Sequence, residues 1–321
     1  MASQKVLVVM ALALWACTGA AQDAYPNRPL RIVVGFTPGG GPDITARHVA
    51  QRLAESLGQQ VIVENRPGAG GTVAAAMVVR AAPDGYTLLS VSSAHAAAAA
   101  IYPKLPYDTL KDLAGVTQTG SSKYVLVAAP SSGMKSLGEL LAAARSRPGQ
   151  LNFTSAGVGS GTHFAGELFK SMAAIDVVHV PHKGIPEALA DVLSGRVHFF
   201  MAPIANAVNQ VREGRLAALG VSSLSRDALL PEVPTIDEAG VPRYECELWF
   251  GLLAPARVPR PIMARLASEI GRILSDADTR ARWTPLGIEP RPTTPEAFDR
   301  LLRSEVATFA RIAREANITS Q

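Results

Sequence analysis

The stretch Ile32-Val-Val-Gly-Phe-Thr-Pro-Gly-Gly-Gly-Pro-Asp43 decides how the chain is organised. A run with the apolar character of a strand leads into three consecutive glycines, which cost conformational entropy wherever a chain is ordered. Pro42 suits the first position of a helix, and apolar residues at helical spacing predict that this helix ends near Leu57. The start of a helix offers unpaired N–H groups and the positive end of its dipole. We therefore interpret the glycine loop as an anion-binding loop, with Asp43 either complementing the dipole or holding the loop from behind.

The same strand–loop–helix unit recurs along the chain. A second glycine loop follows a strand at residues 66–71, and Ser92-Ser93 follow a third strand. We expect strands at residues 30–34, 60–64, 87–91, 124–128, 151–154, 177–180, 197–201, 216–221 and 247–253. Strands that alternate with helices predict an α/β fold with parallel sheets, in which ligands bind beyond the carboxyl ends of the strands.

The repetition predicts two Rossmann-like lobes rather than one. We expect a discontinuous first domain of residues 25–121 and 246–321, and a second domain of residues 122–245. The chain then crosses between the lobes twice, near residues 118–122 and 223–246. Paired crossings form a hinge, and a ligand cleft opens between the lobes.

The second lobe carries its own glycine–serine loop, Ser155-Ala-Gly-Val-Gly-Ser-Gly-Thr162. Its hydroxyl groups add hydrogen-bond donors to the backbone amides, and His163 falls in the first turn of the helix that follows. His163 is either a structural residue or part of the site. An exported hydrolase using Ser160 and His163 is an alternative, although residues three apart at a helix start need not face each other.

Composition excludes several classes of protein. The chain has 321 residues, 48% hydrophobic and 18% charged, with a net charge of +4 and no run of basic residues, so nucleic-acid binding is unsupported. The P-loop, Gly-x-Ser-x-Gly and His-Glu-x-x-His signatures are absent. Of the two cysteines, Cys17 lies in a predicted leader and Cys246 is left without a partner, so no disulfide framework and no metal site are expected.

The amino terminus has the pattern of an export signal. Lys5 precedes an apolar run that is too short to span a bilayer, and small residues follow it. We expect residues 1–21 to be a signal peptide and the mature protein to be exported. Leu14-Trp-Ala-Cys17 also has some likeness to a lipoprotein cleavage site, and the sequence leaves lipidation of Cys17 open.

Several longer segments carry a family resemblance. They are Tyr25-Pro-Asn-Arg-Pro29, Val34-Gly-Phe-Thr-Pro-Gly-Gly-Gly-Pro-Asp43, Val63-Glu-Asn-Arg-Pro-Gly-Ala-Gly-Gly71, Ala82-Pro-Asp-Gly-Tyr-Thr-Leu-Leu89, Leu105-Pro-Tyr-Asp108, Val180-Pro-His-Lys-Gly184, Glu232-Val-Pro-Thr235, Glu238-Ala-Gly-Val-Pro242 and Trp249-Phe-Gly-Leu-Leu-Ala-Pro255. Together they resemble the substrate-binding proteins of the tripartite tricarboxylate transporters, the Bug receptors. The resemblance implies a periplasmic binding protein of the type II fold. Such a protein delivers a small carboxylate, such as a di- or tricarboxylate, to a membrane permease. We expect no cofactor and no enzymatic activity. The sequence does not reveal the oligomeric state, but a monomer suits docking on a permease. A sensory protein that signals to a membrane kinase is an alternative that the sequence does not separate from transport.

The resemblance also implies which residues hold the ligand. Phe36 is expected to pack on its carbon skeleton. The implied positions are Phe36, Thr37, Gly39, Gly40 and Asp43 in the first loop, Ser92 and Ser93 in the third, Ser155, Gly157, Gly159, Ser160, Thr162 and His163 in the second lobe, and His182. Two departures from the family pattern stand out. His182 replaces a common tyrosine, and Ala202-Pro203 stand where many members have an aspartate that could receive a ligand amine, so a plain carboxylate is favoured over an amino acid.

Overall fold

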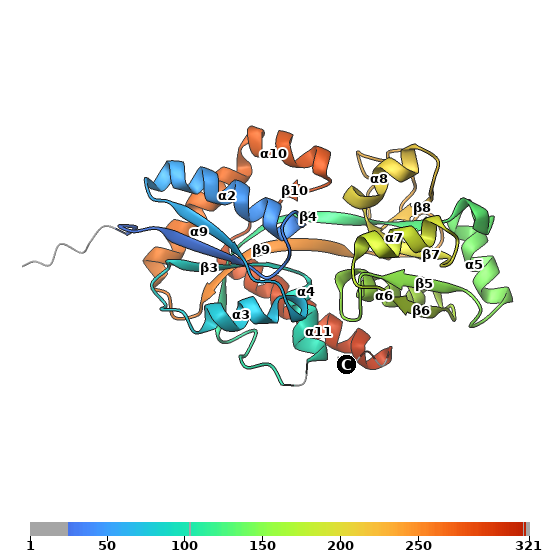
Figure 1. Ribbon diagram of the computed structural model, residues 1–321, viewed down its shortest axis with the longest axis horizontal. Helices are drawn as coiled ribbons and strands as arrows, with labels where there is room; N and C mark the ends of the chain where they lie inside the picture. The colour runs from blue at the N-terminus through green and yellow to red at the C-terminus, as the bar shows by residue number, and fades with distance from the viewer. Residues whose placement is uncertain (1–24, 103, 317, 319–321) are drawn as a thin grey trace, which may run out of the picture.

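The computed structural model describes residues 25–102, 104–316 and 318, and it has two α/β lobes side by side (Figure 1). The predicted signal peptide and Cys17 lie outside the described residues. The strands are β1 (Leu30–Val34), β2 (Val61–Asn65), β3 (Thr87–Ser92), β4 (Leu113–Ala128), β5 (Asn152–Ser155), β6 (Val178–Pro181), β7 (Phe199–Pro203), β8 (Ala217–Val221), β9 (Glu247–Pro255) and β10 (Glu289–Pro290). The α-helices are α2 (Gly41–Leu57), α3 (Thr72–Val79), α4 (Ala94–Ile101), α5 (Leu137–Ser146), α6 (Gly161–Ala173), α7 (Ile185–Leu193), α8 (Ile204–Arg212), α9 (Arg260–Ser275), α10 (Ala277–Trp283) and α11 (Pro295–Glu315).

The strands form one sheet that runs through both lobes in the order β2-β1-β3-β9-β4-β7-β5-β6, with β8 and β10 also paired to β4. The predicted parallel pairing is confirmed where β1 lies between β2 and β3, and where β5 lies between β6 and β7. It is wrong for β4 and β9, which pair antiparallel with each other and with their outer neighbours β7 and β3. The sheet is therefore mixed, because these two strands run between the lobes in opposite directions.

Strand β4 is much longer than the predicted strand of residues 124–128. Its first part pairs with β9 from Leu113 opposite Pro255 to Lys123 opposite Glu247, and its last residues pair with β7 and β8 in the second lobe. The sequence of residues 115–123 is rich in glycine, serine and threonine, so it lacks the apolar alternation that marks a strand. The predicted crossing at residues 118–122 therefore lies within one continuous strand.

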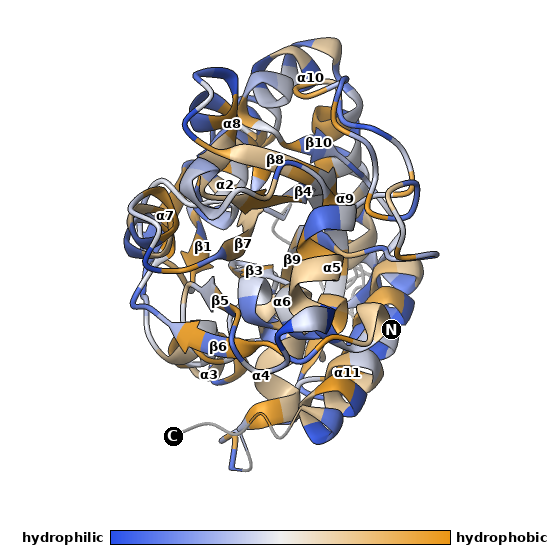
Figure 2. Ribbon diagram, turned by 90° about the vertical axis from the view of Figure 1, so that its right-hand side faces the viewer, coloured by the Kyte–Doolittle hydropathy of each residue, from blue (hydrophilic) through white to orange (hydrophobic). Residues whose placement is uncertain are grey.

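Helices cover both faces of the sheet in each lobe (Figure 2). Because successive strand residues point to opposite faces, Ile32 packs with α2 and α9, whereas Val33 packs with α3, α4 and α11. In the second lobe, α5 and α6 pack on one face of the sheet, and α7 and α8 on the other. Within the described residues, none of these helices has both the length and the apolar character that a membrane span requires.

Helix α11 contacts elements of both lobes. The ring of Phe309 on α11 lies 4.7 Å from that of Phe164 on α6, centroid to centroid. On the first-lobe side, the indole N–H of Trp249 on β9 donates to Glu305 of α11 at 3.2 Å. The last helix of the chain therefore braces the region where β4 and β9 cross between the lobes.

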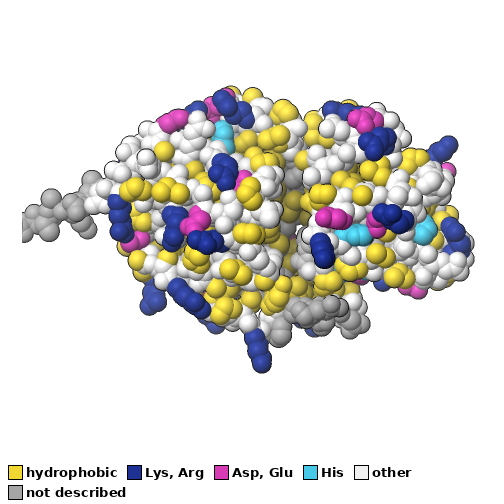
Figure 3. All heavy atoms as spheres, viewed as in Figure 1, with side chains coloured by type: hydrophobic (Ala, Val, Ile, Leu, Met, Phe, Trp, Pro, Cys, Tyr) yellow, Lys and Arg dark blue, Asp and Glu magenta, His cyan; other side chains and the backbone are white. Residues whose placement is uncertain are grey.

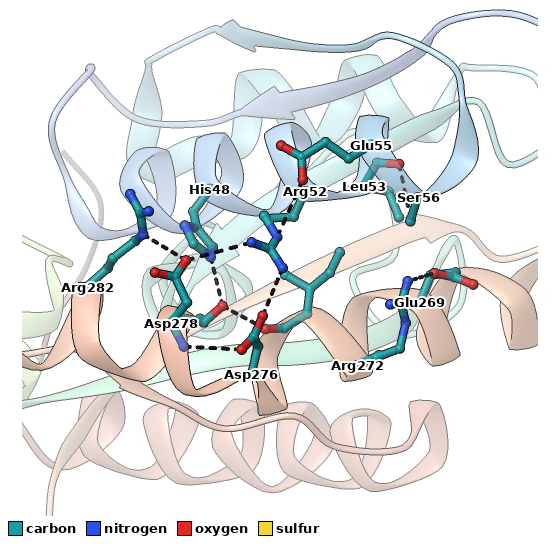
Figure 4. A network of polar contacts seen from close by, with 12 residues as sticks. His48, Arg52, Leu53, Glu55, Ser56, Glu269, Arg272, Asp276, Asp278 and Arg282 are labelled. Carbon is teal, nitrogen blue, oxygen red and sulfur yellow. Dashed lines mark hydrogen bonds and ion pairs between the residues drawn. The ribbon is translucent and has the colours of Figure 1, made fainter.

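A network of polar contacts fixes α2, the helix that follows the first glycine loop (Figure 4). From α2, Arg52 reaches Asp276 at 2.8 Å, and His48 Nε2 lies 2.8 Å from the hydroxyl of Thr279 in α10. Asp278 in turn pairs with Arg282 at 2.8 Å. The network ties α2 to α10, so the start of α2 is presented toward the second lobe from a fixed base.

Candidate functional site

A cleft lies between the two lobes, and the space-filling view shows the surface hollowed along their boundary (Figure 3). The cavity in it has a volume of about 620 Å³. Its lining combines the loops at the carboxyl ends of the strands with the first turns of several helices. Eight of the predicted ligand-binding residues line it, namely Phe36, Thr37, Gly39, Gly40, Ser92, Gly159, Ser160 and Thr162.

The other six predicted residues do not line the cavity; they lie behind its walls. Ser93, Ser155 and His163 are buried. The carbonyl of Gly157 accepts hydrogen bonds from the Ser160 amide and the Ser155 hydroxyl of its own loop. His182 turns its ring to α7, where Nε2 lies 3.0 Å from Asp191 but outside hydrogen-bond geometry. Asp43 is buried beneath the first loop, as the interpretation that it holds the loop from behind requires.

The first loop is held from below by Asp43 and Asn65. The amide of Gly39 donates to the Asp43 carboxylate at 3.0 Å, and the Asn65 side chain donates to Asp43 at 2.7 Å and to the carbonyl of Phe36 at 3.0 Å. Burial raises the pKa of Asp43, but hydrogen bonds from Arg47, Gly39 and Asn65 outweigh it and hold that pKa below its usual range. Asp43 is therefore an anion that its own neighbours satisfy.

The second loop is also held internally, and more of its amides are occupied than the sequence suggested. The amide of Gly159 donates to Nδ1 of His163 at 3.1 Å, and that of Ala156 donates to the Thr162 hydroxyl at 2.9 Å. The amides of Gly157, Ser160 and His163 also have partners within the loop. Within the described part of the chain, Gly41 at the start of α2 and Gly161 and Thr162 at the start of α6 keep amides without a hydrogen-bond partner.

Two aromatic side chains, from the strands β4 and β9 that join the lobes, pack against the first residues of α2 and α6. A Cβ atom on Gly41 would lie 2.2 Å from the ring of Phe250 on β9, and one on Gly161 would lie 2.5 Å from the hydroxyl of Tyr124 on β4. Both distances are far below van der Waals contact, so only glycine allows the backbone to approach so closely. Phe250 and Tyr124 also line the cavity and form part of its floor.

The electrostatic character of the cavity is positive. Helices α2, α6 and α7 point their first turns into it, where helix dipoles favour negative charge. Among the described residues that line the cavity, Lys183 is the one charged side chain, and no aspartate or glutamate is present. Apolar residues such as Ala98 and Ile101 cover other parts of the wall. The arrangement suits an organic anion with a nonpolar carbon chain.

Sequence reasoning missed several lining residues. Lys183, Tyr124, Asn206, Tyr102 and Phe250 all line the cavity. Lys183 could have been predicted from the sequence, because it follows His182 in the Val-Pro-His-Lys-Gly segment and its positive charge suits an anion site. The contribution of Tyr124 and Phe250 depends on how β4 and β9 cross between the lobes, which local sequence does not reveal.

Ser160 and His163 do not form a nucleophile–base pair. The Ser160 hydroxyl caps α6 by accepting the amide N–H of His163, and it also lies 2.9 Å from the Thr162 hydroxyl. The imidazole of His163 instead faces Gly159 through Nδ1 and Glu167 through Nε2, which lies 3.8 Å from the carboxylate. Burial first, and then the charges of His179 and Lys170, lower the pKa of His163 to about 3.

The chain matches a known protein family over most of its length. The family model described as "Tripartite tricarboxylate transporter family receptor" matches residues 45–318. The protein BugT of Bordetella pertussis is 34% identical over 295 residues, which cover 91% of this chain and 90% of that protein. These matches extend over both lobes.

Two solved structures are similar over nearly their whole length. An R. palustris protein solved with adipate is 32% identical with a TM-score of 0.82, and the match covers 92% of this chain and 99% of that one. MatC from Rhodopseudomonas palustris, solved with bound malate, is 36% identical with a TM-score of 0.77, covering 90% of this chain and 99% of that one. The two-lobed fold predicted from the sequence is thereby confirmed.

Proposed function

The chain belongs to the tripartite tricarboxylate transporter receptor family, and from that membership we propose that it captures a small organic carboxylate in the cleft between its lobes. One observation carries the proposal. The starts of α2 and α6 face the same cavity with unpaired amides, and no acidic side chain among the described residues lines that cavity. Amides at helix starts bind carboxylates without a counter-charge on the protein. The first carboxylate would occupy the space between Gly41, Gly161 and Thr162.

The ligand class follows from the rest of the wall. Relatives of this chain were solved with adipate and malate, which are dicarboxylates. Here Lys183 supplies a positive charge away from the helix starts, and Ala98, Ile101 and Phe250 supply apolar surface. Pro203 lines the cavity where a carboxylate could have received a ligand amine. We therefore favour a di- or tricarboxylate without an ammonium group.

A thermal-shift panel tests this assignment. Succinate, glutarate, adipate and citrate are compared with aspartate and glutamate, which add an ammonium group, and with glucose as a neutral control. A ligand at about 100 times its dissociation constant adds roughly 2.7 kcal/mol of stability, which raises the melting temperature of a chain of this length by about 4 °C. At least one plain carboxylate should reach this shift. A panel in which glucose stabilises the protein and no carboxylate does would refute the proposal.

Replacing Lys183 with methionine should separate dicarboxylates from monocarboxylates. Methionine keeps most of the apolar stem and removes the charge that faces the second carboxylate. Because Lys183 is exposed, the lost ion pair is worth at most about 1 kcal/mol, or roughly three- to fivefold in affinity. Calorimetry should show this loss for the best dicarboxylate and no change for a monocarboxylate. Lys135→Met, at an exposed lysine outside the cavity, is the matched control, and an equal loss for both ligands would contradict the role.

Closure of the lobes over the ligand would use β4 and β9. We place the first domain at residues 25–121 and 246–321 and the second at residues 122–245. The antiparallel pairing of the two strands supports this division, since β4 pairs with β9 up to Lys123 and with β7 from Tyr124 onward. Small-angle scattering should show a smaller radius of gyration with saturating ligand than without it.

Delivery to a membrane permease is the role that the family description favours. Receptors of this family act in the periplasm, and we place this chain there as a monomer that docks on the permease after closure. No feature of the cleft favours the sensory or the hydrolytic alternative.

A further inference from the structure

Helices α2 and α6, whose first residues line the cavity, begin in the same way, although their sequences share little besides glycine. In each, the third helical residue accepts a hydrogen bond from the amide of a glycine four residues earlier. Asp43 accepts from Gly39 at 3.0 Å in the first lobe, and His163 accepts from Gly159 at 3.1 Å in the second. The backbone agrees closely as well. The two glycines have φ of 85° and 77°, and the capping residues that follow have φ and ψ of −78° and 163° and of −72° and 159°.

The neighbours of His163 determine which of its two ring nitrogens carries the proton. The ring is buried and stacks on that of His179, with centroids 3.9 Å apart and planes 15° apart. His179 in turn lies 2.7 Å from the hydroxyl of Ser155, at the base of the loop. Because Nδ1 of His163 accepts the Gly159 N–H, the ring proton must sit on Nε2, which faces Glu167.

We propose that Asp43 and His163 are equivalent positioning residues. Each accepts the amide N–H of the glycine before its helix cap and so acts as a latch that leaves the next amides facing the cleft. The second latch is an imidazole because it must be uncharged. This inference rests on the proposed function, since the amides so presented are those that would hold the carboxylate. Neither residue touches the cavity itself.

The difference in charge between the latches follows from their neighbours. The carboxylate of Asp43 is matched by Arg47, whose guanidinium lies 3.0 Å away, and by Asn65. The charged or titratable groups around His163 are Glu167 and Lys170 on its own helix and His179 from β6. None of these is a cation in hydrogen-bond contact with the latch position. A carboxylate there would place an unbalanced negative charge at the start of α6 and oppose an anionic ligand.

Three substitutions at His163 separate the functions of the ring. Asparagine keeps a neutral acceptor near the position of Nδ1, aspartate keeps an acceptor of similar shape but adds charge, and leucine removes the acceptor. With the panel carboxylate that stabilises the wild type most, calorimetry should give His163→Asn an affinity within about threefold of wild type. His163→Asp and His163→Leu should each lose tenfold or more. Wild-type affinity in His163→Leu, or an equal loss in His163→Asn, would overturn the latch, and wild-type affinity in His163→Asp would overturn its need for neutrality.

A second measurement uses the unsubstituted protein without ligand. Nitrogen-15 NMR of labelled histidine should show His163 as the tautomer protonated on Nε2, without titration between pH 5 and 8. A proton on Nδ1, or titration in this range, would overturn the latch even if the leucine variant fails to fold. If no carboxylate in the panel binds the wild type, the proposed function fails, whereas the NMR result still decides whether the latch exists.

Discussion

Gly40→Val should abolish carboxylate binding and leave the protein folded. Gly40 caps α2 in an extended backbone conformation that any residue adopts, and a Cβ there would come no closer than 3.7 Å to its neighbours. Gly40 lines the cavity next to Gly41. The two methyl groups of a valine there would occupy space beside the Gly41 amide that the carboxylate needs, and they offer no hydrogen bond in return. Loss of hydrogen bonds to a charged ligand costs about 1.5–3 kcal/mol each, so we expect a loss of 100-fold or more once steric exclusion is added.

Two measurements on this variant distinguish exclusion from unfolding. Isothermal titration with the best panel ligand should show no heat of binding, and the melting temperature without ligand should stay within a few degrees of wild type. Gly271→Val is the matched control, because Gly271 also has open space around its Cβ position but lies on α9, outside the cavity. Retained affinity in Gly40→Val would show that the first loop does not hold the ligand.

Acidification below about pH 6.5 should destabilise the fold through two buried histidines, His95 and His163. Burial lowers the pKa of His95 to about 4, and burial followed by the charges of His179 and Lys170 lowers that of His163 to about 3. Below pH 6.5 these imidazoles become protonated in the unfolded chain, whereas in the folded chain they stay neutral. Stability is therefore lost as the pH falls from about 6.5 toward these lowered values, by about 1.4 kcal/mol per pH unit for each residue.

Chemical denaturation between pH 7.5 and 4.5 measures this slope, and His95→Leu isolates one residue's share. Nε2 of His95 has no partner within the described part of the chain, so leucine should cost little at pH 7.5 and reduce the slope by about 1.4 kcal/mol per pH unit. The difference between variants is the useful quantity, because burial raises the pKa values of Glu247 and Glu305 and their protonation opposes the histidines. Tyr107→Phe, at the ring stacked on His95, should keep the wild-type slope. An unchanged slope in His95→Leu would contradict the prediction.

Local pattern was enough to predict the parts of the fold that depend on neighbours in sequence. The strand at Leu30–Val34, the glycine loop and the helix after it follow from apolar spacing and from the position of Pro42. The second-lobe loop and its helix were found in the same way. Convergence of the loops then followed from a general rule for α/β sheets, and eight of the predicted residues do line one cavity.

What the sequence did not predict depends on contacts between distant segments. The first half of β4 is recognisable as a strand only because β9, more than a hundred residues later, pairs with it. The same two strands bring Tyr124 and Phe250 beneath the helix starts. His163 was predicted to be either structural or ligand-facing, and its burial against His179 becomes visible only once β5 and β6 are paired.

The position of β9 in the sheet has a consequence for the folding of the protein during its synthesis. Strand β9 lies between β3 and β4 and comes after the whole second lobe in the chain, and α11, which braces both lobes, comes later still. While the ribosome has not yet produced residue 247, the first lobe lacks a central strand and cannot close its core. The cleft is therefore assembled only after β9 and α11 have been synthesised, when translation is nearly complete.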